Sequence, residues 1–364
     1  MNVQVGSYAG NSTDNRAITG VGFAPDVVII KGDTTQRACF KTNGLAGDNT
    51  LVFNSSTSFS GGIKTFDSDG FTVGTDARAN SSGVTYYWVA FKKASANLNT
   101  GTYSGNATDN RNITGVGFQP DVVVTRGDNT ANGAFRDDLE AGTSAHVFVD
   151  AMDDDNSIQA LAADGFQLGD GGNTNGSGVP YYWMAFKKVS GVFATGSYTG
   201  NATDNRSITG VGFRPDAVLI KIATTSSSAA RNAVMYTTSM GSDSAAFLSS
   251  ASSNRSNMVQ GVEADGFQIG TDDHINASGL AYHYLAWKAD SPATTTSTSS
   301  STSTTSTSTS TTSTSSSTTS TSTSTTSTST STSTTSTSTT STSSSTTSTS
   351  TTTTLPFVFS VEEI

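Results

Sequence analysis

Three tandem copies of one segment constrain the fold of this 364-residue chain more than any other feature of its sequence. Tyr8, Tyr103 and Tyr198 mark the copies at a spacing of 95 residues, within SYAGNSTDNRAITGVGFAPDVVI, TYSGNATDNRNITGVGFQPDVVV and SYTGNATDNRSITGVGFRPDAVL. A second block, DGFTVG followed by YYWVAFKK, recurs as DGFQLG with YYWMAFKK and as DGFQIG with YHYLAWKA. A unit of this length has the size of a domain and exceeds a solenoid repeat, so we expect three domains, at residues 1–94, 95–189 and 190–290.

The pattern inside each unit is that of short strands joined by turns. Residues 27–31 form an apolar run directly after a Pro-Asp pair, which suits a buried strand. Each unit also has an Asp-Gly pair, the first at Asp69-Gly70, which favours a hairpin with a type I′ turn. In residues 86–91 both alternating sets are apolar, so one face should lie in a core and the other against a neighbour or a ligand. The sequence predicts an all-β protein of three tandem antiparallel β-sandwiches, with roughly seven strands in each.

A Ser/Thr tract follows the repeats. Residues 294–354 are 61 consecutive Ser and Thr residues. Such a tract has almost no apolar surface to bury against the entropy cost of ordering, so we expect residues 291–354 to form a disordered stalk. The decapeptide LPFVFSVEEI, from Leu355 to Ile364, is either a strand that docks on a partner's sheet edge or a frayed chain end.

Charge and cysteine content exclude several kinds of partner and site. A net charge of −10 and an isoelectric point near 4.6 argue against nucleic acid and anionic membrane surfaces as partners. No stretch approaches the roughly 20 apolar residues of a membrane span. Cys39 is the only cysteine, which excludes an intrachain disulfide and a cysteine-based zinc site.

The N-terminal sequence MNVQVGSYAG has neither the charged segment nor the apolar segment of a signal peptide. We therefore expect either a protein made in the cytoplasm and released by lysis or assembly, or one whose leader has been removed. Its expected location is the virion or the extracellular space.

The two repeated blocks resemble those of known proteins. The pattern ITGVGFxPDVVI followed by DGFxxG and YYWVAF resembles the β-sandwich repeats of bacteriophage tail and other virion-associated proteins, and it is more distantly similar to H-type lectins. The resemblance extends over nearly all of residues 3–289. It implies a β-sandwich fold and, through the lectins, which bind sugars as trimers of small sandwiches, a role in recognising glycans. No lectin site can be matched residue by residue.

A polar Asp-Asn-Arg cluster recurs beside a turn in every unit. One interpretation is that Asp and Asn bind sugar hydroxyls while Arg stacks or bridges. The other, which we favour, is that these side chains close a loop by satisfying backbone N–H groups and pairing a nearby carboxylate. The ligand-binding candidates of this type are Asp14, Asn15, Arg16, Asp109, Asn110, Arg111, Asp204, Asn205 and Arg206.

The aromatic strand of each unit offers further ligand candidates, because flat rings stack on sugars. Most of such a strand is expected to be core. Tyr87, Tyr182 and His283 are the better ligand candidates, since the third unit replaces a tyrosine with a polar imidazole that a buried position would tolerate poorly.

Metal binding and catalysis have little support in the sequence. An acidic run at residues 153–155 and the loop at residues 169–173 offer oxygen ligands for calcium, but they lack EF-hand spacing, and a solvated loop is the better interpretation. His146, His274 and His283 lie far apart in sequence without a cysteine partner, which argues against zinc. No histidine recurs between units and turns explain the repeated carboxylates, so we expect no catalytic residue, no metal and no cofactor.

These observations favour a non-enzymatic surface-attachment protein, a virion or tail-fibre-like appendage that recognises a cell-surface glycan or receptor. A secreted microbial adhesin on a Ser/Thr stalk and a structural spacer without a ligand are the alternatives.

Overall fold

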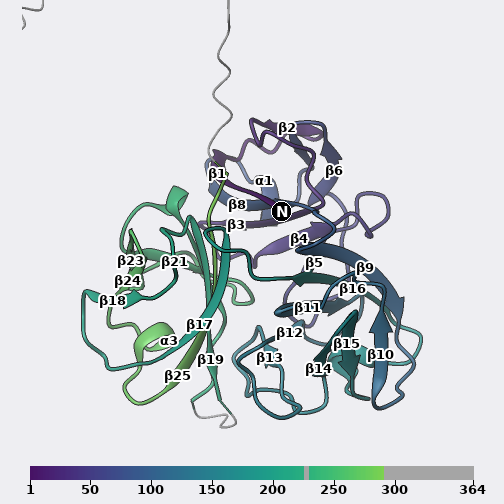
Figure 1. Ribbon diagram of the computed structural model, residues 1–364. Helices are drawn as coiled ribbons and strands as arrows, with labels where there is room; N and C mark the ends of the chain where they lie inside the picture. Colours follow the sequence, from purple (N-terminus) through teal and green to yellow (C-terminus); the bar gives the residue numbers. More distant parts are fainter. Residues whose placement is uncertain (225–228, 291–364) are drawn as a thin grey trace, which may run out of the picture. The chain divides into compact units, whose positions relative to one another are not determined.

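The computed structural model describes residues 1–224 and 229–290, which belong to one compact unit (Figure 1). These residues form antiparallel sheets joined by turns and a few one-turn helices, so the predicted all-β class is confirmed. The expected stalk at residues 291–354 and the decapeptide after it lie outside the described residues. No helix in the described part of the chain is long and apolar enough to cross a membrane.

The three repeats have the same succession of strands. The first consists of β1 (Asn2–Ala9), β2 (Arg16–Thr19), β3 (Val27–Gly32), β4 (Cys39–Thr42), β5 (Leu51–Val52), β6 (Ile63–Asp67), β7 (Gly70–Val73), α1 (Ala77–Asn80) and β8 (Thr85–Lys92). The second consists of β9 (Leu98–Ser104), β10 (Arg111–Thr114), β11 (Val122–Gly127), β12 (Ala134–Asp137), β13 (His146–Val147), β14 (Ile158–Ala162), β15 (Gly165–Leu168), α2 (Gly172–Asn175) and β16 (Pro180–Phe186). The described part of the third consists of β17 (Phe193–Thr199), β18 (Arg206–Thr209), β19 (Ala217–Ala223), β20 (Val234–Thr237), η1 (Thr238–Met240), β21 (Ser244–Phe247), β22 (Arg255–Ser256), β23 (Val259–Glu263), β24 (Gly266–Ile269), α3 (Asp273–Asn276) and β25 (Ala281–Trp287). The first two repeats thus have eight strands each, one more than expected.

Two antiparallel sheets form the sandwich of each repeat. In the first repeat, a large sheet in the order β1-β8-β3-β4-β5 faces a small sheet in the order β2-β7-β6. The second repeat has the same arrangement, with β9-β16-β11-β12-β13 and β10-β15-β14, and the third extends its large sheet with β22. Apolar side chains from both sheets, such as Ile18, Val28 and Phe71, pack together in the space between them. The predicted fold of three tandem sandwiches is confirmed.

The Asp-Gly hairpins are present, but the predicted turn type is wrong. The two turn residues between β6 and β7 do not have the positive φ that a type I′ turn requires. The Asp69 carboxylate instead accepts hydrogen bonds from the N–H groups of Gly20 and Gly22, at 3.1 and 2.6 Å. Gly70 follows with a φ of 148°, where an added Cβ would lie 2.0 Å from the carbonyl oxygen of Ile18. The pair therefore ties the hairpin to the end of β2 and the loop after it.

Strand β8 is buried on both faces, as the pattern of residues 86–91 predicts. Tyr86, Trp88 and Ala90 lie in the core of the first sandwich, between its two sheets. Val89 and Phe91 lie on the opposite face, in a second core to which all three repeats contribute. The neighbour expected for this face is thus the rest of the same chain.

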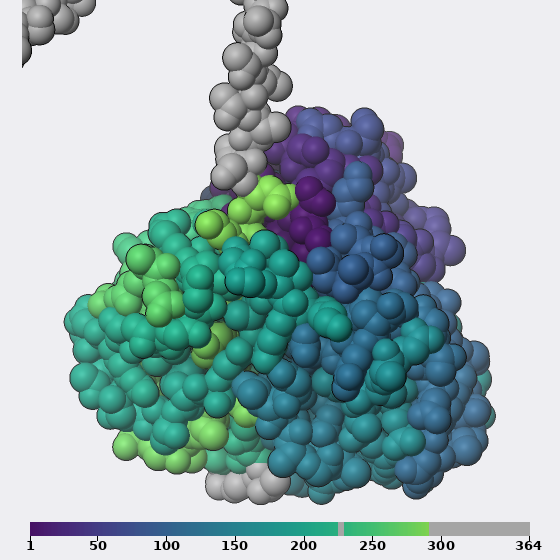
Figure 2. All heavy atoms as spheres, in the orientation of Figure 1, coloured from purple at the N-terminus to yellow at the C-terminus, as the bar shows by residue number. Residues whose placement is uncertain are grey.

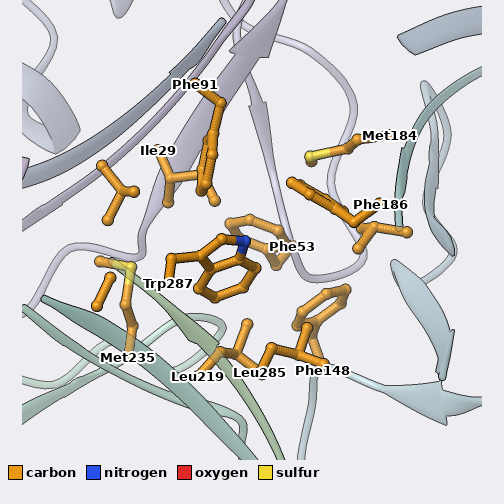
Figure 3. A pocket seen from close by; sticks show the side chains of 13 residues that line it. Ile29, Phe53, Phe91, Phe148, Met184, Phe186, Leu219, Met235, Leu285 and Trp287 are labelled. Atoms are coloured by element: carbon orange, nitrogen blue, oxygen red, sulfur yellow. The ribbon is translucent and has the colours of Figure 1, made fainter. Parts of the chain in front are cut away.

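This shared core joins the large sheets of the three repeats (Figure 3). Phe91, Phe186 and Trp287 occupy equivalent positions and contact one another, with distances between ring centroids of 5.5, 5.5 and 5.7 Å. The side chains around them in Figure 3 are also apolar and come from all three repeats. They enclose a cavity of about 30 Å³, which has room for only about one water molecule. The shared core therefore holds the repeats together and offers no ligand site.

Each repeat contacts a loop of its neighbour, and the succession closes on itself. Equivalent backbone hydrogen bonds of 2.9, 2.9 and 3.1 Å join the repeats in pairs: Gly133 N–H to Phe53 O, Ala233 N–H to Phe148 O and Ala38 N–H to Leu248 O. The last of these joins the first repeat to the third. Figure 2 shows the same closure, because the yellow-green end of the third repeat lies against the purple N-terminus, where Asp290 N–H donates to Val3 O at 2.8 Å. One chain therefore forms a closed ring of three sandwiches.

A fully buried cation lies at the equivalent position of each large sheet: Lys31 in β3, Arg126 in β11 and Lys221 in β19. Arg126 donates hydrogen bonds to the carbonyl oxygens of Val52 and Asn54 in the first repeat, at 2.8 and 2.7 Å. Lys221 donates to the carbonyl oxygen of Val149 in the second repeat at 3.0 Å. Burial lowers the pKa of the two lysines to about 8 and that of Arg126 to about 10. Arg126 and Lys221 thus hold a loop of the preceding repeat by its backbone oxygens.

Candidate functional site

The three Asp-Asn-Arg clusters lie on equivalent loops between the first two strands of each repeat. We call these the DNR loops; they comprise residues 10–16, 105–111 and 200–206. Residues 11–15 and their counterparts in the other two loops are all exposed. Asn15, Asn110 and Asn205 have φ values of 53°, 57° and 55°, a left-handed conformation that asparagine adopts more readily than most residues.

A fully buried asparagine at the end of each short helix fixes the DNR loop. Asn80 donates from Nδ2 to the carbonyl oxygen of Thr13 at 2.8 Å, and its Oδ1 accepts from the N–H of Asn11 at 3.0 Å. Asn175 and Asn276 make the same hydrogen bonds in the other two repeats. These asparagines are not among the site residues predicted from the sequence. Their recurrence six residues after the last glycine of each DGFxxG block is the signal that could have found them.

The arginine of each cluster belongs to the frame of its loop. Arg16 Nη1 donates to the carbonyl oxygen of Ala9 and to Asn80 Oδ1, the latter at 3.2 Å. Its guanidinium lies 5.1 Å from the centroid of the Tyr8 ring, whose burial raises the pKa of the phenol well above its usual value. The same contacts recur at Arg111 and Arg206. The arginine therefore helps to hold its loop, but its partners are a carbonyl oxygen and an amide oxygen, and not the carboxylate that the structural interpretation expected.

Replacing Arg16 by alanine should lower the free energy of unfolding by roughly 1–3 kcal/mol, because the change removes charged hydrogen bonds to two oxygens. Urea denaturation followed by intrinsic fluorescence measures the loss, and Arg111→Ala and Arg206→Ala should give losses of the same size. Lys64→Ala is the control: it removes only a surface ion pair with Asp14 and should leave stability nearly unchanged. Unchanged stability of Arg16→Ala together with a lost binding activity would instead make Arg16 a ligand-binding residue.

The aspartates and asparagines of the clusters stay at the surface. Lys64 Nζ lies 3.0 Å from Asp14 Oδ1, and this hydrogen bond lowers the pKa of the Asp14 carboxyl. In the other repeats a glutamine replaces the lysine, with Gln159 donating to Asp109 at 2.8 Å and Gln260 donating to Asp204 at 2.7 Å. Each DNR loop therefore combines an exposed carboxylate and an exposed amide on a fixed backbone.

The three aromatic-strand candidates differ in their surroundings. Tyr87 and Tyr182 are half-buried, and burial raises the pKa of both phenols. His283 is only 8% exposed, and its Nδ1 lies 2.9 Å from Oδ2 of Asp137 in the second repeat. The expectation that a buried position would not tolerate an imidazole is therefore wrong, because a carboxylate of the neighbouring repeat pairs with it.

Four side chains meet between the second and third repeats, although no pattern in the sequence connects them. We call them the histidine cluster; they are Asp137, Glu140, His146 and His283. His146 Nε2 lies 3.0 Å from His283 Nδ1 and 3.0 Å from Glu140 Oε2. Burial disfavours a charged His146, but its hydrogen bonds to Asp153 and Glu140 outweigh burial and raise its pKa to about 9. Separation in the sequence therefore does not exclude zinc, because the fold brings together two histidines that are 137 positions apart.

The acidic run at residues 153–155 does not converge on one point. Its carboxylates accept hydrogen bonds from different parts of the chain: Asp153 from His146 and Thr224, Asp154 from Asn173, and Asp155 from Ser144. Within the described residues, the geometry of this run therefore gives the calcium alternative no support.

A family model described as a domain of unknown function, DUF7483, matches the chain three times in tandem, at residues 2–101, 93–196 and 188–356. The chain therefore belongs to this family, and the matches confirm the threefold repeat. No curated protein and no solved structure was found to match the chain. The resemblance to virion repeats and to H-type lectins stays a prediction.

Proposed function

We propose that this protein is a non-enzymatic attachment protein that binds carbohydrate at a cell surface through its three DNR loops. The observation that carries the proposal is repetition: one closed ring presents three copies of the same exposed polar loop, each held by the same hydrogen bonds from a buried asparagine. A structural spacer has no need to repeat a set of exposed residues.

The chemistry of the DNR loops suits sugar hydroxyls, which both donate and accept hydrogen bonds. The Asp14 carboxylate accepts hydrogen bonds, and the Asn15 amide donates and accepts them. Asn80 and Arg16 hold the loop in one conformation before any ligand arrives, which reduces the entropy cost of binding. Because a single loop of this size offers little contact area, each site alone would bind weakly.

Three weak sites on one ring can act together on a surface that carries many copies of a glycan. Linked sites raise apparent affinity by roughly 10²–10⁴ when the geometry permits simultaneous binding. The shared core and the buried cations fix the three repeats to one another, so the loops act from a rigid base. Such a surface would serve a virion appendage, which is our preferred context, and equally a secreted adhesin.

The test removes the asparagine amides without disturbing the loop backbone. Glycine adopts positive φ freely, so Asn15→Gly, Asn110→Gly and Asn205→Gly keep the conformation and delete the amide. We expect variants of one, two and three loops to lose apparent affinity stepwise on a glycan array and on intact cells. The full-length chain is used throughout.

Asp150→Ala is the matched control, because Asp150 is exposed and lies outside the DNR loops. It should leave binding unchanged. Full binding by the triple glycine variant would place the site elsewhere on the protein. A wild-type chain that binds no glycan and no cell would leave the structural spacer as the better account.

A further inference from the structure

We propose that the histidine cluster is a binding site for one divalent transition-metal ion, and that zinc is the ion it fits best. The cluster lies between the second and third repeats and is separate from the DNR loops. The inference does not depend on the proposed function, because it concerns how two repeats are joined.

The four side chains direct their donor atoms toward a common point. His146 Nε2, His283 Nδ1 and one carboxylate oxygen each of Asp137 and Glu140 lie within 4.8 Å of one another. Three of the separations are 3.0, 3.0 and 2.9 Å, and a fourth is 3.9 Å. A tetrahedral zinc ion with bonds of about 2.0–2.1 Å requires separations of roughly 3.3 Å, so small shifts would accommodate it.

The hydrogen bonds around the cluster orient these atoms as metal ligands. His146 Nδ1 donates to Asp153 Oδ1 at 2.9 Å, which leaves the lone pair of Nε2 for the cluster. Asp153 is itself held by the N–H of Thr224 at 2.7 Å. Asp137 Oδ1 accepts from the N–H groups of Leu139 and Glu140, both at 3.1 Å. Without a metal, a protonated His146 donates from Nε2 to Glu140, and metal binding releases this proton. Both imidazoles are then neutral, all four inward atoms are acceptors, and the cation satisfies them together.

The ring has three junctions, which are the contact regions between neighbouring repeats, and the histidine cluster is present at one of them. At the first-to-second junction, the equivalent positions are Thr42, Leu45, Leu51 and Tyr182, and at the third-to-first junction they are Thr237, Met240, Ala246 and Tyr87. Neither set contains a histidine or a carboxylate. All four positions therefore carry metal-binding side chains at one junction and none at the other two, although the surrounding strands are the same. A coordinated change of four residues is what a metal site requires, whereas random divergence has no reason to change them together.

The donor set and its burial indicate the ion and its role. Two imidazole nitrogens favour zinc or a neighbouring transition metal over calcium or magnesium, which prefer oxygen ligands. Two carboxylates and one divalent cation sum to zero charge, which suits a buried position. His146 and Asp137 are fully buried and all four ligands come from the chain, so the site is closed and its ion would fasten the third repeat to the second.

The experiment measures metal binding by the full-length protein. The chain is stripped with a chelator, dialysed and titrated with zinc chloride against a competing chelator, and with cobalt chloride while the visible spectrum is recorded. We expect one zinc ion per chain, a rise in melting temperature on zinc addition, and the intense visible bands of tetrahedral cobalt. Asp153→Asn should weaken zinc binding about 10- to 100-fold while the cobalt bands remain.

The other junctions supply the matched variants. Asp137→Thr, Glu140→Leu, His146→Leu and His283→Tyr together recreate the first-to-second junction, so this fourfold variant should fold and have a melting temperature that zinc does not change. His274→Ala removes the third histidine and should bind zinc as the wild type does. Two results would overturn the proposal: a wild-type chain that neither binds zinc nor gives the cobalt bands, or equal zinc binding by the fourfold variant.

Discussion

Replacing Trp287 by alanine is expected to lower the free energy of unfolding of the whole ring by about 3–5 kcal/mol. Trp287 is 6% exposed, and its ring contacts those of Phe91, Phe186 and Phe193, so truncation opens a cavity where the three repeats meet. No repeat can complete this core alone. We therefore expect one cooperative urea transition for all three sandwiches, moved to lower denaturant concentration.

Two variants separate this expectation from a local effect. Trp287→Phe places phenylalanine at all three equivalent positions and should cost much less than alanine. Leu139→Ala removes an apolar side chain that is 40% exposed and should leave the transition nearly unchanged. Separate transitions for the repeats, or a loss of hydrogen-exchange protection confined to the third repeat, would show that the shared core does not couple them.

Replacing Arg126 by alanine should have an effect of similar size, a loss of about 3–5 kcal/mol, because it leaves several buried carbonyl oxygens without a donor. Among them are Val52 and Asn54 of the first repeat, which accept from Arg126 at 2.8 and 2.7 Å. The loss should appear in urea denaturation. It should also appear as faster hydrogen exchange in the loop that follows β5, although Arg126 lies in β11.

The natural sequence suggests the control for this prediction. Lys31 and Lys221 occupy the equivalent positions of the other repeats, so Arg126→Lys keeps a buried cation that the fold accepts elsewhere. We expect Arg126→Lys to lose less stability than Arg126→Ala, because a lysine ammonium can still donate to some of the carbonyl oxygens. Equal losses for the two variants would mean that shape, and not hydrogen bonding, determines the role of this position.

Much of the fold was predictable because the same strand and turn patterns recur in all three repeats. The apolar run at residues 27–31 and the Asp-Gly hairpin follow from preferences of neighbouring residues. The two apolar faces of residues 86–91 already indicated a second buried surface. The pattern does not predict that this surface packs against the same surface of the other two repeats. The contacts between Phe91, Phe186 and Trp287 depend on how whole sandwiches are placed.

The candidate sites differ in the same way: one is formed by residues adjacent in the sequence, and the other by contacts between repeats. The DNR loops were visible in the sequence because their residues are adjacent and recur, and the favoured role of Arg16 depended on local loop chemistry. The histidine cluster was not visible, because the acid that pairs with His283 lies 146 positions away and belongs to another repeat. The sequence shows that a histidine replaces tyrosine at position 283, and without a known partner such a polar ring predicts an exposed position. Asp137, which pairs with the ring, explains why the position is buried. A titratable residue in a buried strand needs a polar partner, and for His283 of the third repeat that partner is Asp137 of the second repeat.

Closure of the ring within one chain makes its assembly unimolecular. In a trimer of separate subunits, dilution shifts the equilibrium toward free subunits, and stability depends on protein concentration. Here the hydrogen bond between Asp290 and Val3 joins two ends of the same folded region, so dilution cannot separate the three sandwiches. A single molecule can therefore carry all three loops at any concentration, and each junction is free to acquire residues that the other two lack.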